Sequence, residues 1–177
     1  MSTSDQPVTG INGYEVYENK TYEPYFTSVL PSNWIVNYRS LTSQDGGWIS
    51  AQGPFDKTGS RHISLDIQLL NRSNDAIFNS LNDFAQYSLK QESIGTVEVK
   101  IDAERKIGNV SGWEYKIIMQ RSVMGANGPV NIVLAKQWFI IPRGNSFLCV
   151  YFESPVDDFD TYIDVYNKFL AHWELAW

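Results

Sequence analysis

The chain has 177 residues, of which 43% are hydrophobic, 14% aromatic and 19% charged. This length predicts one domain with a sizeable buried core, and the composition excludes a disordered, collagen-like or disulfide-stapled chain. With one Cys and two His, the chain can form neither an internal disulfide nor a multi-His or Cys-rich metal centre.

The formal net charge of −6 is distributed unevenly. Residues 1–24 carry four acids and one base, and residues 153–177 carry six acids and one base. Residues 25–152 carry ten acids and twelve bases, with seven bases against three acids between 99 and 143. The overall acidity argues against nucleic-acid binding, which needs a concentrated basic footprint. The basic stretch is either a solvated strand face or a face for an acidic protein partner, whose candidate contacts are Lys100, Arg105, Lys106, Lys116 and Arg121.

The sequence contains no candidate membrane span, because its longest apolar run, Phe147–Phe152, is far shorter than the roughly 20 residues that a spanning helix needs. The polar start lacks the basic and apolar regions of a signal peptide. One interpretation is a cytoplasmic chain. The other, slightly favoured, is an exported chain with a lipid anchor upstream of Met1, since Ser2-Thr-Ser-Asp5 resembles the stretch that follows the lipidated cysteine of bacterial lipoproteins.

The N-terminal half predicts a tether followed by strands. Residues 1–22 lack apolar periodicity and are expected to form a flexible tether, with a single domain over 23–177. Segments 25–30 and 34–38 predict a strand pair around a Pro/Asn turn, and 48–51 predicts a short strand before a loop at 53–60. From His62 to Leu69 apolar and polar residues alternate, which predicts a strand with one wet face.

The C-terminal half predicts one helix, four strands and a final helix. The apolar spacing predicts a helix over about 76–92. The expected strands lie near 96–107, 112–122, 130–141 and 147–152, the last apolar on both faces and therefore central. In the final helix Ser154 is the expected N-cap, with Pro155 at the first helical position and Asp157 completing the capping pattern. Its expected buried stripe comprises Phe159, Ile163, Tyr166, Leu170 and Trp173.

This order of elements resembles the PsbP-like superfamily, which includes PsbP, DcrB-type lipoproteins and a Ran-binding import factor. The matching residues are Val29-Leu-Pro-Ser-Asn-Trp-Ile-Val36, the strand Phe147–Glu153 and the aromatic helix from Phe159 to Trp173. The resemblance covers roughly residues 25–175, in pattern more than in identity. It implies an α+β fold in which an antiparallel sheet of about six to eight strands is sandwiched between helices. Members are usually non-enzymatic and bind proteins, and no functional motif of the family carries over residue by residue.

Three functions follow as hypotheses. The first is a non-enzymatic PsbP-like binding or assembly module, extracytoplasmic and lipid-tethered, without a cofactor. The second is a cytoplasmic protein-binding adaptor or chaperone of the same fold. The third, given least weight, is a small metal-dependent hydrolase.

Few residues suggest catalysis. His62, Ser64 and Asp66 share one strand face, but neighbours on such a face are roughly 6.7 Å apart, and a triad needs contacts of about 2.6–3.2 Å. Asp56-Lys-Thr-Gly-Ser60 is similar to the phosphorylated motif of P-type ATPases, but its composition predicts a turn. We therefore expect no catalytic residues.

The remaining candidates concern metal binding and packing. Asp157, Asp160 and Asp164 lie on one face of the final helix and are the candidate metal ligands, although acids in a first helical turn are also explained by the helix dipole. Cys149 is expected to be a buried, inert thiol. Of the six Trp residues, Trp48 and Trp177 are the freest to bind a partner, and Trp48 joins the candidate partner contacts.

Overall fold

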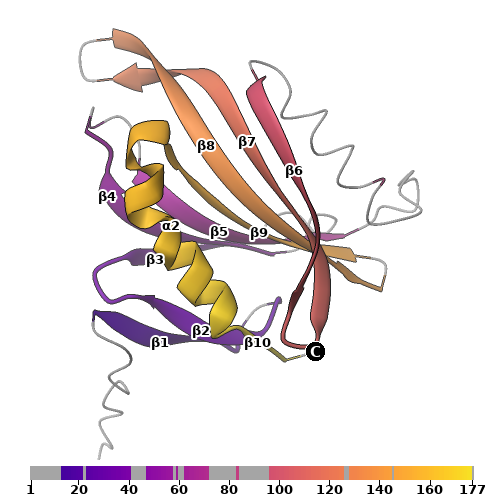
Figure 1. Ribbon diagram of the computed structural model, residues 1–177. Helices are drawn as coiled ribbons and strands as arrows, with labels where there is room; N and C mark the ends of the chain where they lie inside the picture. The colour runs from indigo at the N-terminus through magenta and orange to yellow at the C-terminus, as the bar shows by residue number, and fades with distance from the viewer. Residues whose placement is uncertain are drawn as a thin grey trace, which may run out of the picture.

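The computed structural model describes residues 13–21, 23–40, 47–57, 59, 62–71, 83, 96–125, 128–144 and 146–176, which form two antiparallel sheets and helix α2 (Val156–Ala171) (Figure 1). The larger sheet has seven strands, in the order β3 (Ile35–Ser40), β4 (Gly47–Phe55), β5 (His62–Asn71), β9 (Ser146–Pro155), β8 (Gly128–Arg143), β7 (Val110–Gly125) and β6 (Thr96–Ile107). The smaller sheet has the order β1 (Tyr14–Asn19), β2 (Phe26–Pro31) and β10 (Glu174–Leu175).

The expected antiparallel sheet of six to eight strands is confirmed, and it is strongly curled. Figure 1 shows β6, β7 and β8 turned up relative to β3, β4 and β5. Helix α2 packs on one face of this sheet. The helix expected over 76–92 lies outside the described residues, apart from Asp83, so a helical cover on the second face stays a prediction.

The alternation in β5 separates the two faces of the large sheet. Ile63, Leu65, Ile67 and Leu69 are buried in the main core, together with residues of α2. Strand β9 is central, as expected, because Leu148 and its alternate neighbours face that core while Phe147 and Cys149 belong to a second core on the opposite face. The face opposite α2 is therefore only partly apolar, and its polar part surrounds the site described below.

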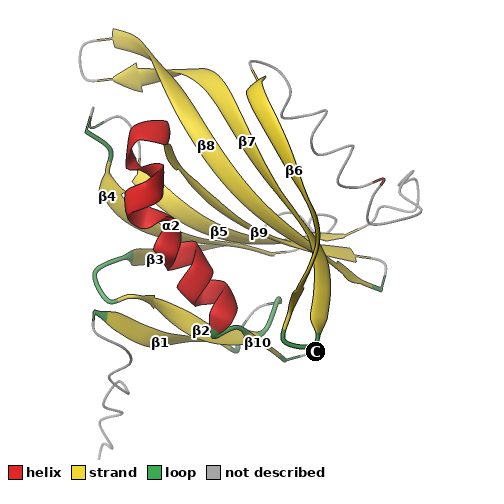
Figure 2. Ribbon diagram, viewed as in Figure 1, coloured by secondary structure: helices red, strands yellow, loops and turns green. Residues whose placement is uncertain are grey.

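Helix α2 connects the two sheets (Figure 2). The Phe169 ring lies 5.7 Å from that of Phe26 and 5.6 Å from that of Trp173, and the Ser28 hydroxyl donates a hydrogen bond of 2.6 Å to the Phe169 carbonyl. These contacts fix the small sheet against the helix. None of the helices in the described part of the chain is long and apolar enough to cross a membrane.

Three local expectations were wrong. Residues 14–19, placed in the tether, form β1, because β1 pairs with β2 along its whole length and Tyr17 packs against Phe26 at 5.8 Å. The two strands around the Pro/Asn turn do not pair: β2 lies in the small sheet and β3 in the large one. Ser154 does not cap the helix, since β9 continues through Pro155, which occupies the cap position, and Ser154 is buried opposite Ala135.

Candidate functional site

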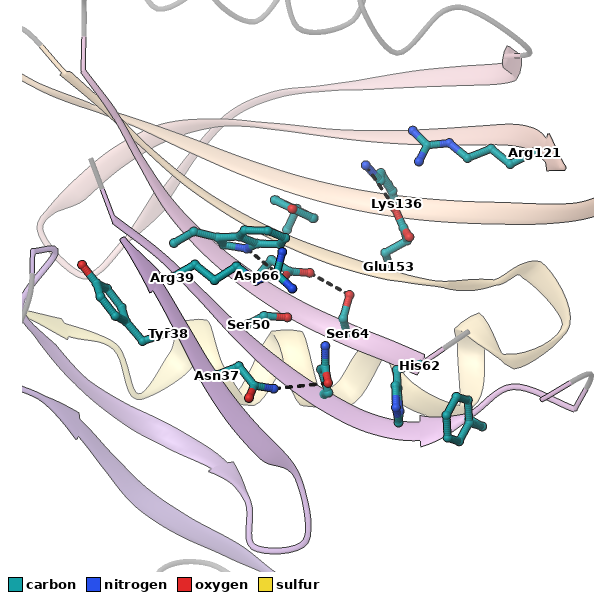
Figure 3. Close-up of a pocket in the computed structure, with 14 residues that line it drawn as sticks. Asn37, Tyr38, Arg39, Ser50, His62, Ser64, Asp66, Arg121, Lys136 and Glu153 are labelled. Carbon is teal, nitrogen blue, oxygen red and sulfur yellow. Dashed lines mark hydrogen bonds and ion pairs between the residues drawn. The ribbon is translucent and has the colours of Figure 1, made fainter. Parts of the chain in front are cut away.

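A pocket of about 740 Å³ lies on the sheet face opposite α2. Figure 3 shows its side chains on one side of strands β3–β5 and the helix on the other. Of the described residues that line the pocket, none is aliphatic. They are Asn37, Tyr38, Arg39, Trp48, Ser50, Gln52, Phe55, His62, Ser64, Asp66, Arg121, Lys136, Tyr151 and Glu153.

Strand register brings these residues together, because residues paired across antiparallel strands project to the same face of a sheet. Ser64 pairs with Glu153, and Glu153 also pairs with Lys136 on its other side. Arg39 pairs with Trp48 across β3 and β4. The curl of the sheet adds Arg121 from β7, so residues more than 80 positions apart line one pocket.

Asp66 lies at the floor of the pocket and is 3% exposed. Its carboxylate oxygens accept hydrogen bonds from the Trp48 indole N–H at 3.0 Å and from the Ser64 hydroxyl at 2.7 Å. Burial raises the pKa of the Asp66 carboxyl, the hydrogen bonds from Ser50, Ser64 and Trp48 lower it in part, and the charge of Glu153 raises it further. The prediction that this face of the strand is exposed to solvent is therefore wrong at Asp66, because neighbouring side chains cover it.

Lys136 and Glu153 form an ion pair of 3.0 Å in which both side chains are buried, at 7% and 2% exposure. The Lys136 ammonium also lies 5.0 Å from the ring centre of Tyr151 and 5.4 Å from that of Trp138. A buried ion pair stabilises a fold weakly, because removing two charges from water costs about as much as their attraction returns. Two central strands therefore carry charges at positions where apolar residues would serve the fold at least as well.

Arg39 is exposed at the rim of the pocket, and its guanidinium carbon lies 5.3 Å from the centre of the Trp48 ring. Such stacking favours Arg by the cation–π attraction and leaves its N–H groups able to donate to another molecule. Because the Trp48 indole N–H is bound to Asp66, the ring that supports Arg39 is itself held in place.

The geometry does not form a catalytic triad. The Nδ1 atom of His62 lies 2.8 Å from the Gly53 carbonyl oxygen, and its ring stacks on Phe55 with centroids 3.8 Å apart. The Ser64 hydroxyl donates to Asp66 and has no His62 base beside it. The site offers hydrogen-bond donors, acceptors and aromatic rings, which suits binding.

The candidate partner contacts do not share one face. Arg105 binds the buried Glu114 carboxylate at 2.5 Å, and Glu114 also accepts a hydrogen bond of 3.0 Å from Tyr166 of α2. Lys116 lies 3.7 Å from the ring centre of Phe159, also on the helix face. Lys106 is exposed on β6, and Lys100 occupies the register position opposite Lys116. Of these candidates, Trp48 and Arg121 line the pocket.

The candidate metal ligands do not converge. Within the described ranges, no three His, Cys, Asp or Glu side chains gather so that they could hold a metal ion, and Asp157, Asp160 and Asp164 lie within those ranges. Asp164 pairs instead with Lys168 at 2.7 Å, and the neighbouring Asp158 pairs with Lys57 at 3.5 Å.

Two packing interpretations are confirmed. Cys149 is fully buried, and burial raises the pKa of its thiol far above the usual range. Asp56 begins a turn that is closed by a hydrogen bond of 2.9 Å from the Gly59 N–H. Trp177, the other Trp regarded as free to bind a partner, lies outside the described residues.

Sequence reasoning missed Arg39, Lys136, Tyr151 and Glu153 as site residues. The signal for Arg39 was its separation from Trp48 along the sequence. Two consecutive antiparallel strands joined by the segment 41–46 place these two residues opposite each other. Lys136 and Glu153 gave a weaker signal, namely single charges within otherwise apolar strands. Their contact became visible only with the register of β8 and β9.

The comparisons with known proteins concern the fold. No protein-family model matches the chain, and no curated protein matches it by sequence. The structure is similar to that of LpqN, a protein involved in cell envelope biogenesis of Mycobacterium tuberculosis, with a TM-score of 0.56 and 14% identity over 92% of this chain and 90% of that chain. It is also similar to the Ran-binding protein Mog1p of Saccharomyces cerevisiae, with a TM-score of 0.53 and 11% identity over 90% of this chain and 95% of that chain.

Cyanobacterial PsbP from Synechocystis aligns over 98% of this chain and 99% of that chain, with a TM-score of 0.48 and 8% identity. The PsbP-like superfamily that the sequence resembles includes a Ran-binding import factor, and Mog1p is a Ran-binding protein. The resemblance to the PsbP-like superfamily is therefore confirmed at the level of the fold, which this chain shares with Mog1p and LpqN.

Proposed function

We propose that this chain is a non-enzymatic binding module that recognises a protein partner through the pocket. The observation that carries the proposal is the composition of the pocket lining, with Trp48, Tyr151, Arg39 and Arg121 and no aliphatic residue among those described. Trp, Tyr and Arg are the residues that dominate the binding energy of protein interfaces. Sites for drug-sized ligands are lined predominantly by hydrophobic and aromatic side chains, so the polar lining favours a protein surface.

The buried charges support the same proposal. Asp66, Lys136 and Glu153 cost the fold stability or contribute little to it, which is typical of residues retained for a site. The hydrogen-bond partners of Ser64 and His62 argue against hydrolysis. Mog1p, which has the same fold, is a Ran-binding protein, and this supports protein recognition as a use of the fold.

The proposal extends to location and domain organisation. The module consists of one domain, which includes β1 and therefore starts no later than Tyr14. We favour an extracytoplasmic, lipid-tethered module, with a cytoplasmic adaptor as the alternative. The involvement of LpqN in cell envelope biogenesis supports the first. Fractionation of source cells distinguishes the two: we expect the protein in the envelope fraction and its release by detergent, whereas recovery in the cytosol would overturn the lipid-tethered form.

Photo-cross-linking in source cells tests the binding function. The photoreactive residue p-benzoylphenylalanine replaces Phe55, which is 58% exposed at the rim of the pocket. The control position is Val16, which is 47% exposed on β1 and does not line the pocket. We expect a discrete protein adduct at position 55 that is absent at position 16. Equal labelling at both positions, or none at position 55, would contradict the proposed function.

A further inference from the structure

One cation of the pocket, Arg39, lies at a position where it can meet a partner. Arg39 is exposed, and it makes no ion pair within the part of the chain that the structure describes. Its stacking on Trp48 orients a guanidinium whose planar fork matches a carboxylate. A stacked Arg loses less conformational entropy on binding than a mobile one, since its position is already restricted.

Among the described lining residues, the charge balance at the rim of the pocket is positive. Arg39, Arg121 and Lys136 oppose Asp66 and Glu153. Lys136 and Glu153 offset each other at 3.0 Å, and Asp66 is covered by its hydrogen-bond donors at the floor. Figure 3 shows the Arg121 side chain extending from β7 toward the end of the pocket that holds Lys136. Among the described lining residues, a negatively charged group at the rim therefore meets the exposed Arg39 before it meets an acid.

The acids of helix α2 do not cancel this local charge. Helix α2, which carries Asp157, Asp158, Asp160 and Asp164, lies on the opposite side of the strands (Figure 3). Exposed charges are screened beyond about 8–10 Å at physiological salt. Among the described residues, those that line the pocket therefore contribute most to the charge that a bound group experiences.

The rest of the lining suits a peptide chain. At the rim the amide of Asn37 donates a hydrogen bond of 3.2 Å to that of Gln52, and the remaining donors and acceptors of both amides can pair with backbone groups. The pocket draws residues from β3 across the sheet to β7, so its length exceeds that of a single carboxylate. Tyr151 and Phe55 add rings against which partner side chains can pack.

We propose that the partner presents an acidic segment, a short exposed stretch with Asp or Glu, and that Arg39 and Arg121 bind its carboxylates while Trp48 holds Arg39 in position. This inference rests on the proposed function and specifies the chemistry of the partner. Trp48 is a positioning residue here, because it acts through Arg39.

Selection from a phage-displayed library of random dodecapeptides tests the inference. The full chain is immobilised, and bound peptides are sequenced and compared with the input library. We expect enrichment of Asp and Glu. A synthetic peptide from the enriched set is then titrated calorimetrically against four proteins: the natural chain and the variants Arg39→Gln, Arg121→Gln and Lys106→Gln. Lys106 is exposed, lies outside the pocket and loses the same charge, so it is the matched control.

We expect Arg39→Gln and Arg121→Gln each to weaken binding about tenfold, the loss typical of a charge-assisted hydrogen bond, and Lys106→Gln to change it less than twofold. Replacement of the acids of the peptide by Gln or Asn should weaken binding similarly. Equal weakening by Lys106→Gln would overturn the inference, because it would indicate non-specific charge attraction. Displacement of the peptide by glutarate at equal molar concentration would also overturn it, in favour of a small dicarboxylate ligand.

The same selection separates this inference from the proposed function. If the enriched peptides are neutral or basic and lose binding on Trp48→Phe, the pocket binds a partner of another chemistry and only the acidic segment is wrong. If no peptide is enriched, the acidic segment is again wrong, and the cross-linking at position 55 decides the binding function independently. Circular dichroism of each variant shows whether it is folded, and the two Arg variants are exposed or half-buried substitutions that leave the core intact.

Discussion

Glu153→Gln is expected to destabilise the protein strongly, because it removes the carboxylate charge that lies 3.0 Å from the buried Lys136 ammonium. Breaking a buried ion pair by removing one partner costs about 3–5 kcal/mol. For a domain of 150–250 residues each kcal/mol lowers Tm by about 2–4 °C. The expected decrease in Tm is therefore about 6–20 °C, measured by circular dichroism.

Replacement of both charges gives the opposite expectation. In Lys136→Met with Glu153→Met, two buried charges become apolar side chains of similar length, and such replacements are often neutral or stabilising by about 1–4 kcal/mol. The free energy of unfolding in urea should return to the natural value or exceed it. The matched control is Asp164→Asn, which breaks the exposed pair with Lys168 and should cost less than about 0.5 kcal/mol.

A double variant as unstable as Glu153→Gln would refute the reasoning. That result would mean that the fold itself requires the ion pair, and the buried charges would no longer support a binding site. A double variant that is stable but fails to bind the selected peptide would support it.

Three further predictions concern the pH dependence of stability, the core and the thiol. Burial raises the folded-state pKa of the Asp66 carboxyl above its ordinary value of 3.8. The contribution of this group to stability is therefore full below pH 3.8 and is lost as the pH rises through the folded-state pKa. In urea unfolding the natural chain should lose stability relative to Asp66→Asn from about pH 4 upward, and a difference that stays constant with pH would contradict this. Phe169→Ala removes a fully buried ring that packs on Phe26 and should lower the free energy of unfolding by about 3–5 kcal/mol, whereas a loss below about 1 kcal/mol would show that the helix is not held by this contact. The Cys149 thiol should react with a disulfide reagent such as DTNB only at the rate of unfolding, and rapid labelling of the native protein would contradict its burial.

Local patterns predicted the elements that depend on a single face. The alternation from Ile63 to Leu69 identified both faces of β5, and the apolar run at Phe147–Phe152 identified a central strand. The expected stripe of the final helix was correct at Phe159, Tyr166 and Leu170, while Ile163 is only partly buried. Trp173 is also partly buried, but it lies beyond the end of α2 at Ala171. These predictions succeeded because burial of one face is encoded within a few neighbouring residues.

Features that depend on distant residues were not predictable in this way. Strand β1 carries little apolar alternation, because it is an edge strand held by Tyr17 and by its pairing with β2. Ser154 matched a capping pattern, but its pairing with Ala135 extends β9 and determines where the helix begins. In both cases a tertiary contact overrode the local signal.

The candidate site shows the same limit. The basic stretch at 99–143 suggested one charged face, but alternation along β6 and β7 divides it between two faces. On the helix side Arg105 forms an ion pair with Glu114, and the Lys116 ammonium lies over the Phe159 ring. The pocket instead combines Arg39, which lies outside that stretch, with Arg121. Charge counts along the sequence show which charged residues share a face only after the strand order is known.

The most direct test of the pocket as the binding site is an NMR titration of the isotope-labelled chain with the selected acidic peptide. Backbone amide and Trp indole signals report each strand separately. We predict chemical-shift changes at Arg39, the Trp48 indole, Ser64 and Tyr151, with none in the outer face of α2. Changes confined to the helix, or to Arg105 and its neighbours on β6, would contradict the pocket as the binding site.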